Sequence, residues 1–185
     1  MLADEHESVT GAVAAVKALF TDVFHKGKTH LIDLILTEDF RFQYPFPGFS
    51  AGKEGIAEFT KLFHGAFPGF ELDVNELYGS FHNGRPIVTI RWTFRGTQQG
   101  DFAGVKATSH YVTFSAIGMY GGSGGGGGTA AVVAIGTNAS GSDDPHRRFV
   151  QLNTGWLEMD FYGLLHQLKL VPPIETLLPR IRRKF

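Results

Sequence analysis

The sequence predicts a single domain of the α+β class, in which helices cover one face of a curved antiparallel sheet. Apolar residues recur at helical spacing in the first third of the chain, and from about residue 70 onward they alternate with a period of two. Asn83-Gly84, the strongest short hairpin signal in the chain, separates two alternating segments. The length of 185 residues suits one domain, or one domain with an insertion.

Three helices and one strand are expected before residue 70. Each helix carries an apolar stripe on one face, and Gly27 ends the first of them. The strand places Phe40, Phe42 and Tyr44 on the same face, because side chains alternate along a strand. In chain order these elements are the helix Val9–Phe24, a short helix from Thr29 or His30 to Ile35, the strand Thr37–Tyr44 and the helix Lys53–Phe67.

Four strands and a short helix are expected after residue 70. The strands are Phe70–Phe81, Arg85–Thr97, Ser109–Tyr120 and a last strand that begins at Phe149; the helix follows Asp160.

A glycine-rich segment interrupts this pattern. Residues 121–145 contain the run GGSGGGGG, which has no side chains to bury and is expected to be a flexible insertion. Within it, Thr129–Thr137 is apolar enough for a short strand, although a mobile loop fits equally well. Residues 171–185 are expected to form a C-terminal tail.

Composition excludes several classes of function. The formal net charge is −1 with dispersed basic residues, which argues against a general nucleic-acid binder. The chain has no cysteine, so thiolate chemistry and cysteine-based zinc sites are excluded, and its eight histidines show no spacing typical of a metal site. The first residues do not resemble a secretory signal, and no apolar run is long enough to span a membrane. A soluble, cytoplasmic protein is therefore expected.

The end of the last strand holds the main candidate for catalysis. Trp156, Glu158 and Asp160 share one face of the strand, while Leu157 and Met159 occupy the other. A carboxylate that lies beside aromatic residues is desolvated, which raises its pKa and suits it to proton transfer. The alternative is that Asp160 only caps the following helix, since aspartate is a preferred N-cap residue.

Three stretches resemble those of a known family. Residues 91–105 (RWTFRGTQQGDFAGV) are similar to a family segment written R-W-x-x-R-G-T-H-x-G-x-F-x-G-I, and residues 156–168 are similar to the family motif W-x-x-x-D-x-x-G-L-L-x-Q-L-G up to its final glycine. Phe67-Pro68-Gly69-Phe70 resembles the family's joint between the third helix and the first long strand. The family is that of the SnoaL-like polyketide cyclases, within the nuclear-transport-factor-2-like (NTF2-like) superfamily.

The resemblance implies a cone-shaped NTF2-like barrel, in which the curved sheet and the N-terminal helices enclose an apolar pocket. It implies Asp160 as the general acid/base of an intramolecular aldol-type ring closure on a hydrophobic, polyketide-like small molecule, without metal or organic cofactor. It also implies a homodimer formed through the outer face of the sheet.

Other residues are candidates for the pocket. His110 could carry a second proton, and Tyr44 could donate a hydrogen bond to an enolate oxygen. Gln98 stands where the family frequently has histidine, and Gln43-Tyr44 stands where it commonly has Asp-His. The residues expected to contact a substrate are Trp156, Trp92, Phe42, Phe63, Phe114 and Gln98.

Three functions remain open from the sequence. The first is a cofactor-independent cyclase or isomerase that uses Asp160. The second is a non-catalytic module of the same fold that binds a small ligand or dimerises, because this superfamily hosts enzymes and non-catalytic proteins alike. The third is water addition, as in epoxide hydrolases of the superfamily, with Asp160 paired to Glu158 or Asp101.

Overall fold

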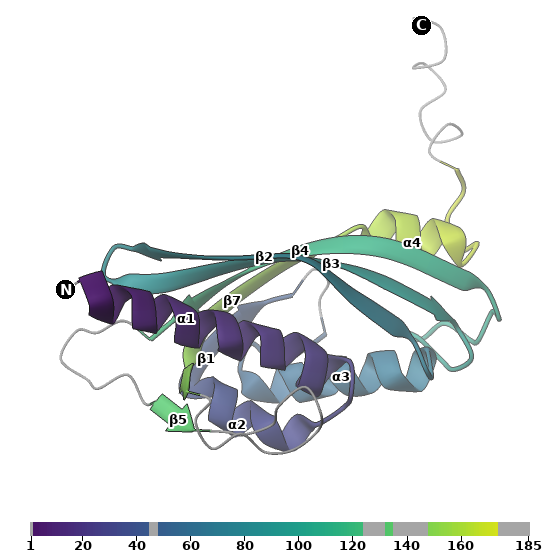
Figure 1. Ribbon diagram of the computed structural model, residues 1–185. Coiled ribbons are helices and arrows are strands. Elements are labelled where there is room, and N and C mark those ends of the chain that lie inside the picture. Colours follow the sequence, from purple (N-terminus) through teal and green to yellow (C-terminus); the bar gives the residue numbers. More distant parts are fainter. Residues whose placement is uncertain (1, 45–47, 124–131, 135–147, 174–185) are drawn as a thin grey trace, which may run out of the picture.

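The computed structural model describes residues 2–44, 48–123, 132–134 and 148–173. These residues form a curved sheet with helices on both of its sides, so the predicted α+β class is confirmed. Figure 1 shows α1, α2 and α3 beneath the sheet and α4 above it. The elements are α1 (Leu2–Ala18), the π turn η1 (Leu19–Phe24), the 3-10 turn η2 (Thr29–Leu31), α2 (Ile32–Ile35), β1 (Leu36–Gln43), α3 (Lys53–Ala66), β2 (Glu71–His82), β3 (Arg85–Thr97), β4 (Tyr111–Gly122), β5 (Val132–Ala134), β6 (Arg148–Val150), β7 (Leu152–Met159) and α4 (Phe161–Gln167).

The main sheet has five strands in the order β1-β7-β4-β3-β2. β1 and β7 are parallel, and the other neighbouring strands are antiparallel. Asn83 and Gly84 connect β2 to β3 with φ values of 49° and 77°, the positive values that a tight hairpin turn needs. The predicted hairpin is therefore confirmed. β5 and β6 form a separate antiparallel ribbon.

The first helix is longer than its apolar stripe suggests. α1 begins at Leu2 rather than at Val9, and its first turn holds Asp4 and Glu5, whose charges suit a helix N-terminus. At its other end α1 continues into η1, where the N–H of His25 donates to the carbonyl of Phe20 at 2.9 Å. This i to i+5 bond is typical of a π turn, a feature found frequently at functional sites.

The boundaries of the glycine-rich insertion need one correction. Gly121 and Gly122 belong to β4 rather than to the insertion. A Cβ on Gly122 would lie 2.6 Å from Pro86 Cγ, so glycine allows β4 to approach β3 closely at this point. β5 confirms the short strand expected within Thr129–Thr137; the rest of the insertion and residues 174–185 lie outside the described residues.

The core lies between the inner face of the sheet and the layer formed by α1, η1 and α3. Alternate side chains of β3 and β4 point into it, and the aromatic ones contact each other and the helices. Phe94 stacks on Phe114 with ring centroids 4.8 Å apart, and Phe63 packs edge-on against Phe94 at 5.4 Å. This aromatic cluster lies next to the cavity described below.

Candidate functional site

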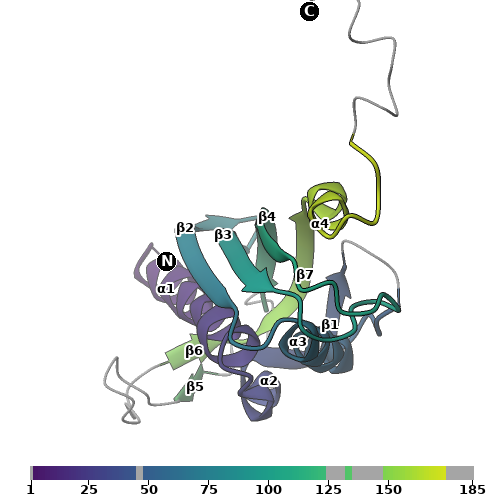
Figure 2. The same ribbon diagram turned by 90° about the vertical axis from the view of Figure 1, so that its right-hand side faces the viewer.

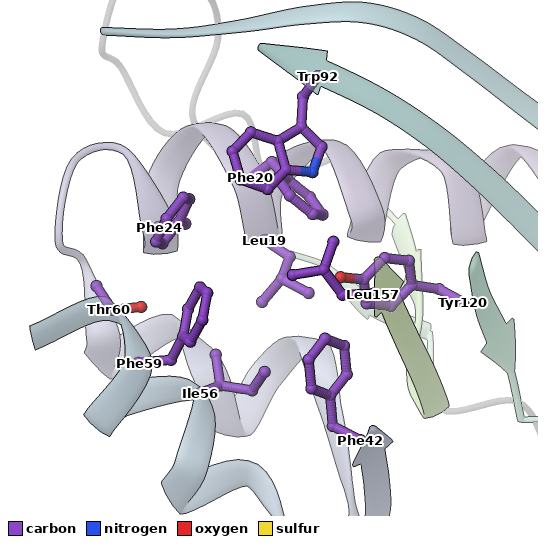
Figure 3. A pocket seen from close by; sticks show the side chains of 10 residues that line it. All are labelled: Leu19, Phe20, Phe24, Phe42, Ile56, Phe59, Thr60, Trp92, Tyr120 and Leu157. Carbon is purple, nitrogen blue, oxygen red and sulfur yellow. The ribbon is translucent and has the colours of Figure 1, made fainter. Parts of the chain in front are cut away.

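A small apolar cavity lies between the sheet and the helices (Figure 3). Its volume is about 30 Å³. A single water molecule needs roughly 10–15 Å³, so the cavity has room for one or two waters. We call it the aromatic cavity, and it is lined by Leu19, Phe20, Phe24, Phe42, Ile56, Phe59, Thr60, Trp92, Tyr120 and Leu157.

The lining comes from segments that are far apart in the chain. η1 contributes the first three residues, and the apolar stripe of α3 contributes Ile56, Phe59 and Thr60. Trp92 and Tyr120 occupy inward positions in the alternation of β3 and β4. Leu157 takes the inward face of β7. The cavity therefore depends on helices and strands packing together, not on one local motif.

Two buried polar groups border the aromatic cavity without a hydrogen-bond partner in the described part of the chain. They are the indole Nε1 of Trp92 and the hydroxyl Oγ1 of Thr60. Leaving a buried donor unpaired costs about 1–3 kcal/mol, because the group has lost its bond to water. An acceptor atom placed in the cavity could recover this energy. The cavity thus offers hydrogen-bond donors on an otherwise apolar wall.

Tyr120 adds a third polar group. Its side chain is only 2% exposed, and Figure 3 shows its hydroxyl directed toward the centre of the cavity. Burial raises the pKa of this phenol strongly, and the nearby Tyr44 adds to the effect. The phenol therefore stays protonated and can donate a hydrogen bond.

Asp160 does not lie in the aromatic cavity, so its expected location is wrong. Its side chain is exposed, and Oδ1 accepts from the N–H of Gly163 at 2.8 Å, which makes it the N-cap of α4. Figure 2 shows α4 on the side of the sheet opposite to α2 and α3. The residue is therefore exposed rather than buried against an aromatic side chain as expected.

The shared face of Trp156, Glu158 and Asp160 was predicted correctly, but this face is the outer one. β7 pairs with β4 so that Leu157 and Met159 are buried, which leaves the alternate residues outside. Trp156 lies opposite Met119 on this outer face and is half-buried, so it does not line the aromatic cavity.

A second, larger hollow of about 370 Å³ lies on the outer face beside α4. It is lined by Arg91, Ser115, Ala116, Ile117, Glu158, Met159 and Asp160. Arg91 donates to Glu76 at 2.8 Å, and this hydrogen bond and charge lower the pKa of Glu76. The hollow thus holds two exposed carboxylates, and its one guanidinium is already paired.

The comparison with known families agrees with this architecture. Residues 14–125 match the sequence profile of the SnoaL-like polyketide cyclases. The chain belongs to this family. The matched range contains every residue that lines the aromatic cavity except Leu157, and it does not reach Asp160. No curated protein matches the sequence.

Solved structures show the same SnoaL-like and NTF2-like fold. TsrD from Streptomyces laurentii is 20% identical, with a TM-score of 0.58 over 85% of this chain and 97% of its own. A Bacillus cereus protein assigned as a polyketide cyclase is 20% identical, with a TM-score of 0.56 over 83% of this chain and 78% of its own. AclR from Streptomyces galilaeus, assigned as a hydroxylase, is 17% identical, with a TM-score of 0.57 over 86% and 96% of the two chains.

Gln98, which stands at the frequent family histidine, is fully buried and organises the loop between β3 and β4. Its amide nitrogen donates to the carbonyl of Gly100 at 3.1 Å, and its amide oxygen accepts from the N–H and hydroxyl of Thr108 at 3.1 and 2.7 Å. The expected contact of Gln98 with a substrate is therefore not supported by its position, since these bonds occupy both ends of its amide.

His110 precedes the inward row of β4 and is half-buried. Its Nδ1 is buried and has no hydrogen-bond partner in the described residues, but His110 does not line the aromatic cavity. The role of His110 as a proton carrier stays a prediction.

Tyr44 lies behind the cavity wall. Its ring contacts those of Phe42 and Phe59, with centroids 4.5 and 5.7 Å away. Its hydroxyl lies against Gly55, where a Cβ would approach it to 2.5 Å, and is buried without a partner in the described residues. Burial raises the pKa of Tyr44, and the charges of nearby glutamates raise it further.

Among the other candidates, Phe42 and Trp92 line the aromatic cavity as expected. Phe63 and Phe114 instead belong to the packed cluster next to it: Phe63 lies 5.4 Å from Phe24, and Phe114 lies 5.9 Å from Trp92.

The sequence reasoning missed Thr60 and Tyr120. Two signals could have found them. Thr60 is a polar residue inside the apolar stripe of α3, and Tyr120 continues the inward row of β4.

The part of the chain that the structure describes lacks two further features, a metal-binding cluster and a membrane-spanning helix. It holds no group of three or more histidine or acidic residues able to bind a metal ion. None of the helices in these residues is long and apolar enough to cross a membrane.

Proposed function

We propose that the protein binds a small, uncharged molecule with an acceptor oxygen, such as a carbonyl, in the aromatic cavity. The observation that carries this proposal is the pair of buried, unpaired donors, Trp92 Nε1–H and the Thr60 hydroxyl, on the wall of an apolar cavity. An oxygen that accepts from either donor would regain a hydrogen bond that folding has left unmade. Membership of the SnoaL-like family, together with its fold, supports a small-molecule site.

The residues of the wall define the chemistry of the ligand. None of the ten described lining residues is acidic, basic or a histidine. A charged ligand would therefore lose its hydration without gaining an ionic partner, which is costly. The six aromatic or indole rings around the cavity favour a flat, apolar body. Since the cavity of about 30 Å³ is smaller than such a ligand, side chains must move when the ligand enters.

A second candidate is cyclase or isomerase chemistry with Asp160 as the acid/base. Family membership and the outer hollow favour it, because the hollow places Asp160 beside Ser115 and Glu158. Water addition by two acids would use Asp160 and Glu158 in the same hollow. Asp101 does not line this hollow; it pairs with Lys106 at 2.7 Å on the β3–β4 loop.

The expected homodimer would use the outer face of the sheet. Tyr78, Ile117 and Met119 expose 65%, 43% and 48% of their surface there. We expect sedimentation equilibrium to show a dimer, and we expect Met119→Glu to raise the dissociation constant of that dimer.

Ligand binding can be tested by tryptophan fluorescence. The chain has two tryptophans, so Trp156→Phe leaves Trp92 as the only reporter at the cavity. We expect saturable quenching by acetophenone and 1-tetralone. Their matched hydrocarbons, ethylbenzene and tetralin, should bind several-fold more weakly because they lack the acceptor oxygen. Equal affinity of each ketone and its hydrocarbon would refute the proposed role of the donors.

Turnover separates the two candidates. Wild type and Asp160→Asn are incubated with a panel of cyclisable polyketide analogues, and the products are followed by mass spectrometry. If the wild type converts an analogue and the Asp160→Asn variant does not, the result would establish the cyclase candidate and place its chemistry in the outer hollow.

A further inference from the structure

We propose that His64 is a positioning residue that holds one wall of the aromatic cavity and thereby limits the size of the ligand. This inference rests on the proposed function. The cavity has two helical walls, one formed by η1 and the other by α3. Phe24 and Phe59 face each other from these walls with ring centroids 5.5 Å apart (Figure 3). A ligand that enlarges the cavity on this side would move these two walls apart.

A hydrogen bond joins the two walls. The imidazole Nε2 of His64, in the last turn of α3, lies 2.8 Å from the carbonyl oxygen of Phe24, the last residue of η1. A carbonyl oxygen only accepts, so the hydrogen of this bond lies on Nε2 of His64. The residues are 40 positions apart in the chain, so the bond fixes tertiary structure.

The end of η1 explains why a side chain is needed at this carbonyl. The last carbonyl groups of a helix lack partners within it. Beyond Phe24 the chain reverses at Gly27, which has a φ of 70°, and the N–H of Lys28 bonds to the carbonyl of Asp22. His64 supplies a donor to the Phe24 carbonyl from another helix.

The imidazole ring of His64 is held in place by its neighbours. Phe70 packs edge-on against it with ring centroids 5.0 Å apart, and Gly27 lies beside it, since a Cβ there would be in van der Waals contact with its Cε1 at 3.5 Å. Phe70 also contacts Phe24 at 5.5 Å. The ring of His64 therefore has a defined orientation, and loss of its hydrogen bond frees the main chain of Phe24 at the cavity wall.

The test measures size selectivity in the Trp156→Phe background. The ligands are acetophenone and 1-acetonaphthone, which carry the same acceptor group on one and two fused rings. His64→Phe keeps a ring but removes the donor, and we expect it to shift the ratio of the two dissociation constants toward the larger ligand by roughly fivefold. His64→Gln keeps a donor at a similar position and should retain the wild-type ratio. A wild-type ratio in His64→Phe would overturn the proposal.

The same variants give a readout that needs no ligand. Acrylamide quenching of Trp92 should be stronger in His64→Phe than in His64→Gln if the wall has loosened. His25→Phe is a matched control, because His25, which directly follows η1, also contacts Phe70, with ring centroids 5.7 Å apart; it should leave quenching unchanged. If neither ketone binds the wild type, the proposed function fails, while equal quenching in all variants overturns the role of His64.

Discussion

Replacing Thr60 by valine should change stability and ligand binding in opposite directions. Valine has the shape of threonine but no hydroxyl, and the two residues have similar helix propensities. Because the Thr60 hydroxyl is buried and unpaired, its removal relieves a desolvation cost of about 1–3 kcal/mol. We expect Thr60→Val to raise the free energy of unfolding by about 1 kcal/mol, which for a domain of this size raises Tm by about 2–4 °C.

The same change should weaken ketone binding. A hydrogen bond from a neutral donor contributes about 0.5–1.5 kcal/mol, so the dissociation constant of 1-tetralone should rise by roughly two- to tenfold. The dissociation constant of tetralin should not rise, since this hydrocarbon has no oxygen to accept the bond. Urea denaturation measures the first effect, and isothermal titration calorimetry measures the second.

Thr37 provides a matched control for Thr60. Its hydroxyl is also buried without a partner in the described residues, but it does not line the aromatic cavity. Thr37→Val should therefore stabilise the protein without changing ketone affinity. A destabilised Thr60→Val protein would show that the hydroxyl is already satisfied in the wild type. Unchanged preference for the ketone would show that Thr60 does not touch the ligand oxygen.

Three more predictions concern Trp92, Asp160 and Asp22. Trp92→Phe removes the second buried donor, so calorimetry should show a roughly two- to tenfold loss of ketone affinity relative to hydrocarbon affinity; an unchanged ratio would contradict this. Asp160→Ala should lower the free energy of unfolding in urea by about 1 kcal/mol because it removes the N-cap of α4, whereas Asp160→Asn, an equally good cap, should not. Burial alone raises the pKa of Asp22, but the hydrogen bond and charge of Lys26, with smaller contributions from its other neighbours, lower it overall. The ionised carboxylate therefore stabilises the folded protein above a pH of about 4, its pKa in the unfolded chain, and this stabilisation is lost as the pH falls through the lower pKa of the folded state. Urea denaturation at pH 7 and pH 3 should show a smaller loss of unfolding free energy for Asp22→Asn than for wild type, and equal losses would refute this.

Much of the fold follows from local patterns that the sequence states directly. The alternation of apolar residues in β3 and the Asn83-Gly84 turn each specify a local geometry, and the structure has both. The apolar stripe of α3 likewise identifies the face that packs on the sheet. The start of α1 was missed because residues 4–8 are all polar, and a helix can extend into solvent without an apolar stripe.

The site was harder to predict because its residues meet only in the folded chain. Trp92 and Phe42 were identified as candidates, whereas Thr60 and Tyr120 acquire meaning only from the cavity that they share with residues of η1. Asp160 was predicted as the catalytic acid/base from its position beside an aromatic residue at the end of a strand, and from the resemblance of the terminal motif to that of the family. The sequence left open the alternative that Asp160 caps the following helix. The hydrogen bond from the N–H of Gly163 to Asp160 shows this cap.

The sequence by itself determined the order of helices and strands and the two sets of residues that alternate along β7. Both sets contain large apolar side chains, so alternation does not decide which set is buried. The tertiary structure decided it, because the pairing of β7 with β4 turns Leu157 into the core and Asp160 toward solvent. A strand has two faces of equal local geometry, and only the layer of helices packed against one of them makes that face the inside.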